Sequence, residues 1–312
     1  MKARFLNQSN LSTGQPLRIA VIGTGIAGMS AAWLLNRKHD ITVFERENRV
    51  GGHSNTVDVP GTRGGIPVDT GFIVYNEKNY PNLTALFRHL SVPTKASEMS
   101  FSASLDGGRL EYCGGGLNGL FGQRRNLARP RFWRMLNDLY RFYRDAPAFL
   151  DDPANRNISL AEFLQNGNYH PALIEDHLYP MGAAIWSTTP AEMGAYPAQA
   201  FIRFFESHGL LKLTDRPSWR TVDGGSREYV KRLTEPFRDN IRFGGVSSIR
   251  RRANEVSVID NAGAERTFDH VVIATHADEA FGLLADPDPR ETALLGAWRY
   301  TRNRAVLHAD PA

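Results

Sequence analysis

Apolar runs and amphipathic stretches alternate near the start of the chain in a pattern that predicts an α/β fold. Residues 18–22 and 41–44 are short apolar runs typical of buried parallel strands, and residues 27–35 between them are typical of a helix. Because strand, helix and strand follow one another closely, we predict a Rossmann-like domain built on a parallel sheet.

This sheet is predicted to be completed by a distant part of the chain. Residues 228–237 have a helical pattern. Residues 255–260 and 270–274 are predicted strands, joined by a turn at residues 261–263. The first domain is therefore expected to be discontinuous, with a long insertion between its two parts.

The insertion begins with a hairpin and continues as helices. Residues 99–105 and 109–113 alternate in polarity across a good turn sequence at residues 106–108. The helices predicted after it cover residues 131–149, 159–164, 171–178 and 197–208. We therefore expect an inserted α+β domain.

The helix predicted over residues 131–149 has an apolar face. That face carries Phe132, Leu136, Leu139 and Tyr143, with Arg134, Asp138, Arg141 and Arg144 largely elsewhere. We favour packing of this face into the inserted domain with the arginines solvated, because most amphipathic helices of soluble proteins face a core. The alternative is contact with an anionic membrane surface and admission of a lipid-like substrate.

The turn after the first strand carries the glycine spacing of a dinucleotide site. Gly23 permits the tight turn, Gly25 lets a pyrophosphate approach the backbone, and Gly28 lets the following helix pack closely. The helix then directs its N-terminal amides at the pyrophosphate. Glu45 ends the second strand and can accept hydrogen bonds from the ribose hydroxyls, which disfavours the 2′-phosphate of NADP.

Residues 45–53 resemble the signature of the flavin amine oxidase superfamily, in which a pattern close to E-x-x-x-R-x-G-G-R precedes a glycine pair that lies along the flavin. Here Gly51 and Gly52 form that pair, and His53 replaces the usual arginine; histidine can still donate to a phosphate or flavin oxygen. The resemblance implies FAD as the cofactor. It disfavours an NAD-dependent dehydrogenase, in which the glycine pair has no function.

Further segments extend the resemblance in the expected order. Residues 67–72 resemble the family's D-x-G segment beside the isoalloxazine ring, and residues 222–226 resemble its G-G-x segment before a helix. Taken singly, Asp69 and Gly71 are equally typical of ordinary turns and loops. The resemblance implies cofactor-binding roles for Gly23, Thr24, Gly25, Ile26, Ala27, Gly28, Glu45, Arg46, Arg49, Gly51, Gly52, His53, Asp69, Thr70, Gly71, Phe72, Val246 and Ala274.

The predicted organisation follows from these segments. It comprises residues 1–16 as a flexible leader, 17–75 and 220–290 as a discontinuous FAD-binding domain, and 76–219 with 291–312 as a substrate or cap domain, including a strand at 304–308. Family members usually continue for roughly another hundred residues. We therefore expect a C-terminally truncated chain that binds FAD weakly or not at all.

The chemistry implied is hydride transfer from a C–H bond of a hydrophobic substrate to flavin N5. No lysine follows Lys231, whereas many amine oxidases of the superfamily use one near N5. Through G-G-H-x-N-T at residues 51–56, V-D-T-G-F-I-V-Y-N at 68–76 and A-V-L-H at 305–308, the chain most resembles a bacterial branch of amine-oxidase-like flavoproteins. Members of that branch tend to be associated with fatty-acid modification, which favours a fatty-acyl substrate. The alternatives are an amine oxidase and a non-catalytic nucleotide-binding fragment, and no catalytic residue is assigned.

The composition of the chain limits its possible binding partners and its expected cellular compartment. A net charge of +4 over 312 residues gives no support for a nucleic-acid partner, and we predict a small hydrophobic or lipid-like substrate without predicting an oligomeric state. The nine histidines show no metal-ligand spacing, so no metal site is predicted, and His177 is assigned to the surface or the cap. One cysteine and a polar start without an apolar segment favour the cytoplasm.

Overall fold

A parallel sheet forms the centre of the first lobe of the molecule. The computed structural model describes residues 14–61, 64–212, 214, 216–300 and 306–307. The four-stranded sheet has the order β10 (Ile241–Phe243), β2 (Asp40–Glu45), β1 (Arg18–Ile22) and β14 (His270–Ile273), and all neighbours are parallel. The α/β fold class predicted from the sequence is confirmed.

Both faces of this sheet are covered, which explains why β1 is an uninterrupted apolar run. Ile19 and Val21 pack on the side of helix α1 (Ile26–Leu35) and the 3-10 helix η5 (Glu235–Asn240). Ala20 and Ile22 pack on the opposite side, because successive strand residues point to opposite faces. Helix α9 (Arg227–Thr234) packs beside α1.

The second face is covered by an antiparallel sheet. Its strands are β11 (Val246–Arg251), β12 (Val256–Asp260) and β13 (Glu265–Phe268), followed after β14 by helices α10 (Ala277–Leu283) and α11 (Pro289–Leu295). The predicted pairing across residues 261–263 is wrong: the turn joins β12 to β13, and β14 pairs with β1. Strand β13 was missed because its exposed polar residues, Glu265 and Arg266, resemble a loop.

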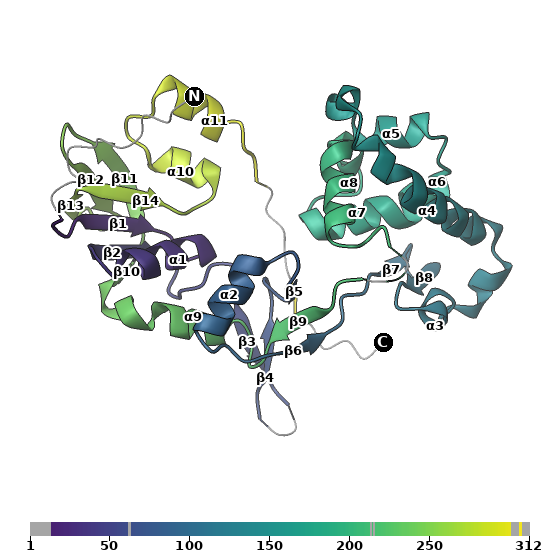
Figure 1. Ribbon diagram of the computed structural model, residues 1–312, viewed down its shortest axis with the longest axis horizontal. Helices are drawn as coiled ribbons and strands as arrows, with labels where there is room; N and C mark the ends of the chain where they lie inside the picture. Colours follow the sequence, from purple (N-terminus) through teal and green to yellow (C-terminus); the bar gives the residue numbers. More distant parts are fainter. Residues whose placement is uncertain (1–13, 62–63, 213, 215, 301–305, 308–312) are drawn as a thin grey trace.

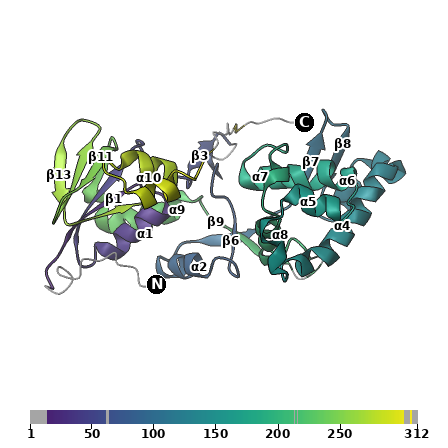
Figure 2. The ribbon, with the colours of Figure 1, turned by 90° about the horizontal axis from the view of Figure 1, so that it is seen from above.

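A small sheet and two other elements lie between the lobes (Figures 1 and 2). They are the hairpin of β3 (Thr56–Val59) with β4 (Ile66–Asp69), helix α2 (Pro81–His89), and the sheet of β5 (Tyr75–Asn76), β9 (Trp219–Val222) and β6 (Thr94–Ser97). In Figure 2, β6 and β9 run from one lobe toward the other.

The second lobe is mainly helical. It contains the predicted hairpin, β7 (Ser102–Leu105) and β8 (Leu110–Cys113), and the helical elements α3 (Leu117–Leu120), η1 (Arg124–Ala128), α4 (Pro130–Phe149), η2 (Pro153–Asn157), α5 (Leu160–Asn166), α6 (Pro171–Leu173), η3 (Ile174–Leu178), α7 (Tyr179–Trp186), η4 (Met193–Ala195) and α8 (Ala198–Ser207). Its core includes Phe142, Leu164, Phe201 and Phe205, all almost fully buried.

Two helical predictions needed correction. The predicted helix 171–178 extends to Trp186, because η3 is a π-helical turn that accommodates Pro180 just after it. Of the face predicted for α4, only Phe132 is buried, whereas Leu136, Leu139 and Tyr143 are partly exposed. Asp138, predicted to lie off this face, is buried, and its carboxylate accepts a hydrogen bond from the backbone N–H of His170 at 2.6 Å.

Several predictions are not tested by these observations. The predicted domain boundaries stay a prediction, although the two lobes have separate hydrophobic cores. Residues 1–13 of the predicted leader lie outside the described residues, as does the predicted strand 304–308 apart from Val306 and Leu307. Among the helices in the described ranges, none has the length and apolar character that a membrane crossing requires.

Candidate functional site

The glycines of the turn after β1 differ in what surrounds them. A Cβ atom on Gly28 would lie 1.9 Å from the carbonyl oxygen of Gly23, and one on Gly23 would lie 2.8 Å from the carbonyl oxygen of Ala274. Both glycines are therefore required by packing. A Cβ on Gly25 would meet no atom of the described chain within 4 Å. Gly25 thus faces open space, as a pyrophosphate contact requires.

The N-terminus of α1 is open in the same way. In the described residues no side chain caps this end, and its first turn holds no acidic residue. Ile26 and Ala27 are exposed. Because the first amides of a helix lack partners within the helix and carry the positive end of its dipole, this end can bind an anion.

The glycine pair lies directly against this turn. The N–H of Gly51 donates to the carbonyl oxygen of Thr24 at 3.1 Å. A Cβ on Gly52, which has a φ of +56°, would lie 2.9 Å from the Cα of Gly25. The structure therefore brings together two segments that the sequence separates by more than a whole helix.

The D-x-G segment joins the same cluster. The N–H of Phe72 donates to the carbonyl oxygen of His53 at 2.9 Å, and a Cβ on Gly71 would lie 2.2 Å from that oxygen. The N–H of Thr70 donates to the carbonyl oxygen of Asn55 at 2.9 Å. Gly71 is thus explained by close approach of two backbones, a condition that the sequence alone does not distinguish from a loop glycine.

Glu45 ends β2 beneath the turn and is only 7% exposed. One carboxylate oxygen accepts a hydrogen bond from the N–H of Thr24 at 3.0 Å and another from the Thr24 hydroxyl. The other oxygen accepts from the N–H of Glu47 at 2.8 Å. A carboxylate offers about four acceptor positions, so part of this capacity is used within the protein. The turn and the second strand are thereby locked together.

Asp69 has a structural partner that the sequence did not reveal. Its carboxylate accepts hydrogen bonds from the N–H of Ser226 at 2.9 Å, from the Ser226 hydroxyl at 2.7 Å and from the Thr56 hydroxyl at 2.6 Å. These bonds tie β4 to β3 and to the first residue before α9. The predicted contact of Asp69 with the cofactor stays a prediction.

The remaining predicted residues are more dispersed. Arg46 forms an ion pair with Glu279 at 2.8 Å. Val246 begins β11 just after Gly245, whose N–H donates to the backbone carbonyl oxygen of Glu45 at 2.9 Å. Arg49 lines a separate cavity of about 530 Å³. The glycines, His53 and Ala274 therefore share one region, and the cavity lined by Arg49 is also lined by Ser54 and Asn55, which follow His53.

An aromatic stack stands beside the glycine cluster. The rings of His53 and His276 are stacked with centroids 5.7 Å apart, and the rings of His276 and Tyr300 are stacked at 4.2 Å. Of these three residues, His53 belongs to the cofactor-binding set predicted from the sequence. The stack joins a segment that follows β2 to one that follows β14.

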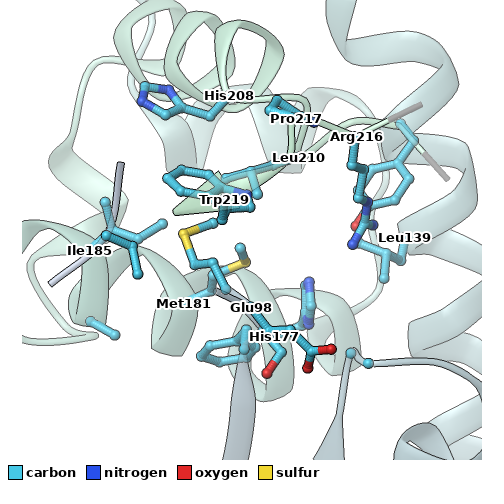
Figure 3. A pocket seen from close by; sticks show the side chains of 18 of the residues that line it. Glu98, Leu139, His177, Met181, Ile185, His208, Leu210, Arg216, Pro217 and Trp219 are labelled. Carbon is cyan, nitrogen blue, oxygen red and sulfur yellow. The ribbon is translucent and has the colours of Figure 1, made fainter. Parts of the chain in front are cut away.

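A cavity of about 1150 Å³ lies in the second lobe and the adjoining small sheet (Figure 3). Much of its lining is apolar and includes Leu136, Leu139, Met181, Ile185, Phe204 and Trp219. Polar groups are also present, among them Glu98, His177, His208 and Arg216. Ligand sites are commonly apolar cavities with a few polar groups, of roughly 300–1,000 Å³. This cavity is large even by that standard.

Comparison with known proteins identifies the family. A model described as flavin containing amine oxidoreductase matches residues 26–306. The chain belongs to this family. A curated L-amino-acid oxidase from Pseudechis australis is 47% identical over 45 residues, which are 14% of this chain and 9% of that protein.

Several solved structures share the fold. A putrescine oxidase has a TM-score of 0.64 at 16% identity, and the cyclohexylamine oxidase from Brevibacterium oxydans has 0.66 at 19%. The CLA-producing fatty acid isomerase from P. acnes has 0.60 at 16%. Each match covers 90% of this chain but 63% of the solved chain. At these identities the likeness concerns the fold alone.

FAD, the cofactor predicted from the sequence, is confirmed by membership of the flavin-containing amine oxidoreductases. The residues present also fit it. Gly25 faces open space, and α1 has an uncapped N-terminus among the described residues. Glu45 lies at the end of the neighbouring strand. Because these features meet at the carboxyl ends of parallel strands, they form the usual position for a dinucleotide.

Sequence reasoning missed most of the cavity, whose lining comes from residues between 74 and 219. No motif links these residues, although the apolar face of the predicted helix 131–149 was a partial signal, since Leu136, Leu139 and Tyr143 line the cavity. His177 was assigned to the surface or the cap, and it lies buried in the second lobe. In the described ranges no three metal-ligating side chains are grouped to hold an ion.

Proposed function

We propose that this chain is the core of an FAD-dependent oxidoreductase that acts on a C–H bond of a hydrophobic substrate. The observation that carries the proposal is the combination of an open glycine-lined nucleotide site with a large apolar cavity in one chain. Bound FAD would supply the acceptor, flavin N5, for a hydride. The protein would supply orientation of the substrate and exclusion of water.

Each part of the nucleotide site has a proposed role. The N-terminus of α1 and the backbone at Gly25 would hold the pyrophosphate, and Glu45 would use its remaining acceptor positions for the ribose. His53, in place of an arginine, would donate to a phosphate or flavin oxygen. The segment from Asp69 to Phe72 would run beside the flavin ring.

The substrate is proposed to be long and apolar, such as a fatty-acyl chain. The cavity walls provide aliphatic and thioether side chains, including Leu136, Leu139 and Met181. Burying one methylene group in such a site contributes about 0.8 kcal/mol, so a chain of many methylenes would bind by burial alone. A small diamine would leave most of the cavity unfilled.

Amine oxidation is the second candidate, and Glu98 favours it. This carboxylate lines the cavity and is exposed to solvent. At the rim of an otherwise apolar cavity it would attract an ammonium group. The absence of any lysine after Lys231 weighs against the chemistry of the lysine-containing amine oxidases.

Anaerobic titration of the FAD-loaded protein tests the proposal. We expect fatty-acyl substrates to bleach the visible flavin absorption, whereas amines would do so if the second candidate holds. No bleaching by any acyl lipid or amine would refute catalysis and leave a nucleotide-binding protein. A substitution tests whether the cavity holds the substrate. Leu139→Trp should obstruct the cavity and prevent bleaching while flavin binding is retained, because Leu139 lies in the cavity wall.

A further inference from the structure

The cavity contains one buried polar atom without a partner. Among the described residues, the buried side-chain nitrogen and oxygen atoms that make no hydrogen bond include Nε2 of His177, and His177 is the only one of these residues that lines the cavity. His177 is 7% exposed, and its ring points into the cavity from the side that also carries Glu98 (Figure 3). A buried polar atom left unpaired is unfavourable, so a ligand that pairs it gains affinity.

The hydrogen bonds around His177 determine its tautomer. The carbonyl oxygen of Asp176 can only accept, and the Tyr112 hydroxyl donates to it at 2.8 Å. The same hydroxyl oxygen lies 2.8 Å from Nδ1 of His177 and has no second proton to donate. Nδ1 must therefore carry the imidazole proton and donate to Tyr112. Nε2 is then left with a lone pair and can only accept.

The environment keeps this ring neutral and fixed. Burial lowers the pKa of His177 to about 4, so the ring carries no charge near neutral pH. The ring of Phe101 meets it edge-on at 5.6 Å, and the ring of Tyr112 stacks on it at 6.0 Å. The residue belongs to the π-helical turn η3, a feature that is frequent at functional sites.

We propose that His177 is the polar anchor of the cavity and accepts a hydrogen bond at Nε2 from an O–H or N–H group on an otherwise apolar ligand. The inference rests on the proposed function, because it takes the cavity as the substrate site. A carboxylate is disfavoured at this position, since both Nε2 and the neighbouring Glu98 are acceptors. A carboxylate would be drawn to Arg216, which lines the cavity and hydrogen bonds to Tyr143.

Equilibrium binding of four ligands with one chain length tests the anchor. Dodecanol and dodecylamine carry a donor, dodecyl methyl ether lacks one, and dodecanoate carries a negative charge. With the full FAD-loaded protein and calorimetric detection, we expect the alcohol to bind about tenfold more tightly than the ether. His177→Phe should abolish that difference. Dodecylamine, an ammonium near neutral pH, and dodecanoate report instead on the charges of Glu98 and Arg216 in the same cavity. Equal binding of the alcohol and the ether to the wild-type protein, or a difference that persists in His177→Phe, would overturn the inference.

Two further measurements do not depend on His177→Phe folding. Nitrogen NMR of the labelled wild-type ring should show a protonated Nδ1 and an unprotonated Nε2, and the opposite tautomer would contradict the proposal. Tyr112→Phe should free the ring to adopt either tautomer and narrow the preference for donors over the ether. Leu139→Ala, a change in the apolar wall, should weaken alcohol and ether equally.

These readouts separate the anchor from the proposed function. Binding is measured without turnover, so a protein that prefers donors through His177 but never reduces its flavin would support the anchor and refute the oxidoreductase. A protein whose flavin is bleached while the alcohol and ether bind equally would support the oxidoreductase and refute the anchor.

Discussion

At the scale of single residues, the glycines of the nucleotide turn separate into those needed for folding and one available to a ligand. Gly28 is needed because a methyl group there would overlap the carbonyl oxygen of Gly23. Gly25 has a φ of −63°, which alanine adopts easily, and faces open space. The same spacing in the sequence therefore combines two different physical requirements.

This difference predicts opposite effects for two alanine substitutions. Gly28→Ala should lower the free energy of unfolding by about 2 kcal/mol, because the backbone must shift. Gly25→Ala should leave the stability of the cofactor-free protein unchanged but weaken FAD binding about tenfold or more, because its methyl group occupies the approach of the pyrophosphate. Chemical denaturation and flavin titration measure the two effects. Equal loss of stability in both variants would contradict the assignment of Gly28 to packing and Gly25 to ligand binding.

His177 predicts a pH dependence of stability. Its pKa is lowered from 6.5 to about 4 on folding, so between these values the unfolded chain binds a proton that the folded chain does not. The free energy of unfolding should therefore fall as the pH decreases from 6.5 toward 4, by about 3 kcal/mol in total, with no contribution from His177 above that range. Urea unfolding across this range should show a shallower decrease in His177→Gln. Parallel curves for the two proteins would exclude the effect.

At the scale of elements, Asp69 joins strands to a helix. Its three donors come from Thr56 on β3 and from Ser226 at the start of α9. Asp69→Ala should lower the free energy of unfolding by about 2 kcal/mol, because a backbone N–H and two hydroxyls lose their acceptor. Asp58→Ala is a matched control on the same hairpin, since Asp58 pairs with Arg227 at the surface, and should change stability little. Thermal unfolding compares them, and equal effects would argue against a special role for Asp69.

The elements that the sequence predicted well are those with a local signal. Strand β1, helix α1 and strand β2 follow from apolar patterning within residues 18–45, and the glycines mark their boundaries. The elements predicted wrongly lack such a signal. Two of the four residues of β13 are exposed and polar, and the strand is held by its pairing with β12. The helical path to Trp186 passes Pro180, which a π-helical turn accommodates. Neither the pairing nor the π-helical turn is marked by apolar patterning.

At the scale of the whole molecule, the two parts of the candidate site differ in how far the sequence reveals them. The nucleotide site is built from short contiguous segments whose glycines are constrained by backbone contacts, so its motifs can be recognised. The cavity is assembled from strands and helices between residues 74 and 219, and its residues are chosen for volume and apolarity rather than for identity. Such a cavity becomes visible only when the elements are packed.

The separate cores of the two lobes lead to a prediction about ligand binding. Several of the proposed FAD contacts lie in the first lobe, at the start of α1, at Glu45 on β2 and at Ala274 after β14, whereas α5, α7 and α8 pack in the core of the second. FAD at a hundredfold excess over its dissociation constant should stabilise the lobe it binds by about 2.7 kcal/mol. Hydrogen exchange should therefore slow at residues 18–45 and 270–274, with little change at residues 160–205. At the same FAD concentration, Gly25→Ala should reduce the stabilisation to about 1.4 kcal/mol if binding is tenfold weaker. Equal protection of both lobes would show that FAD also orders the second.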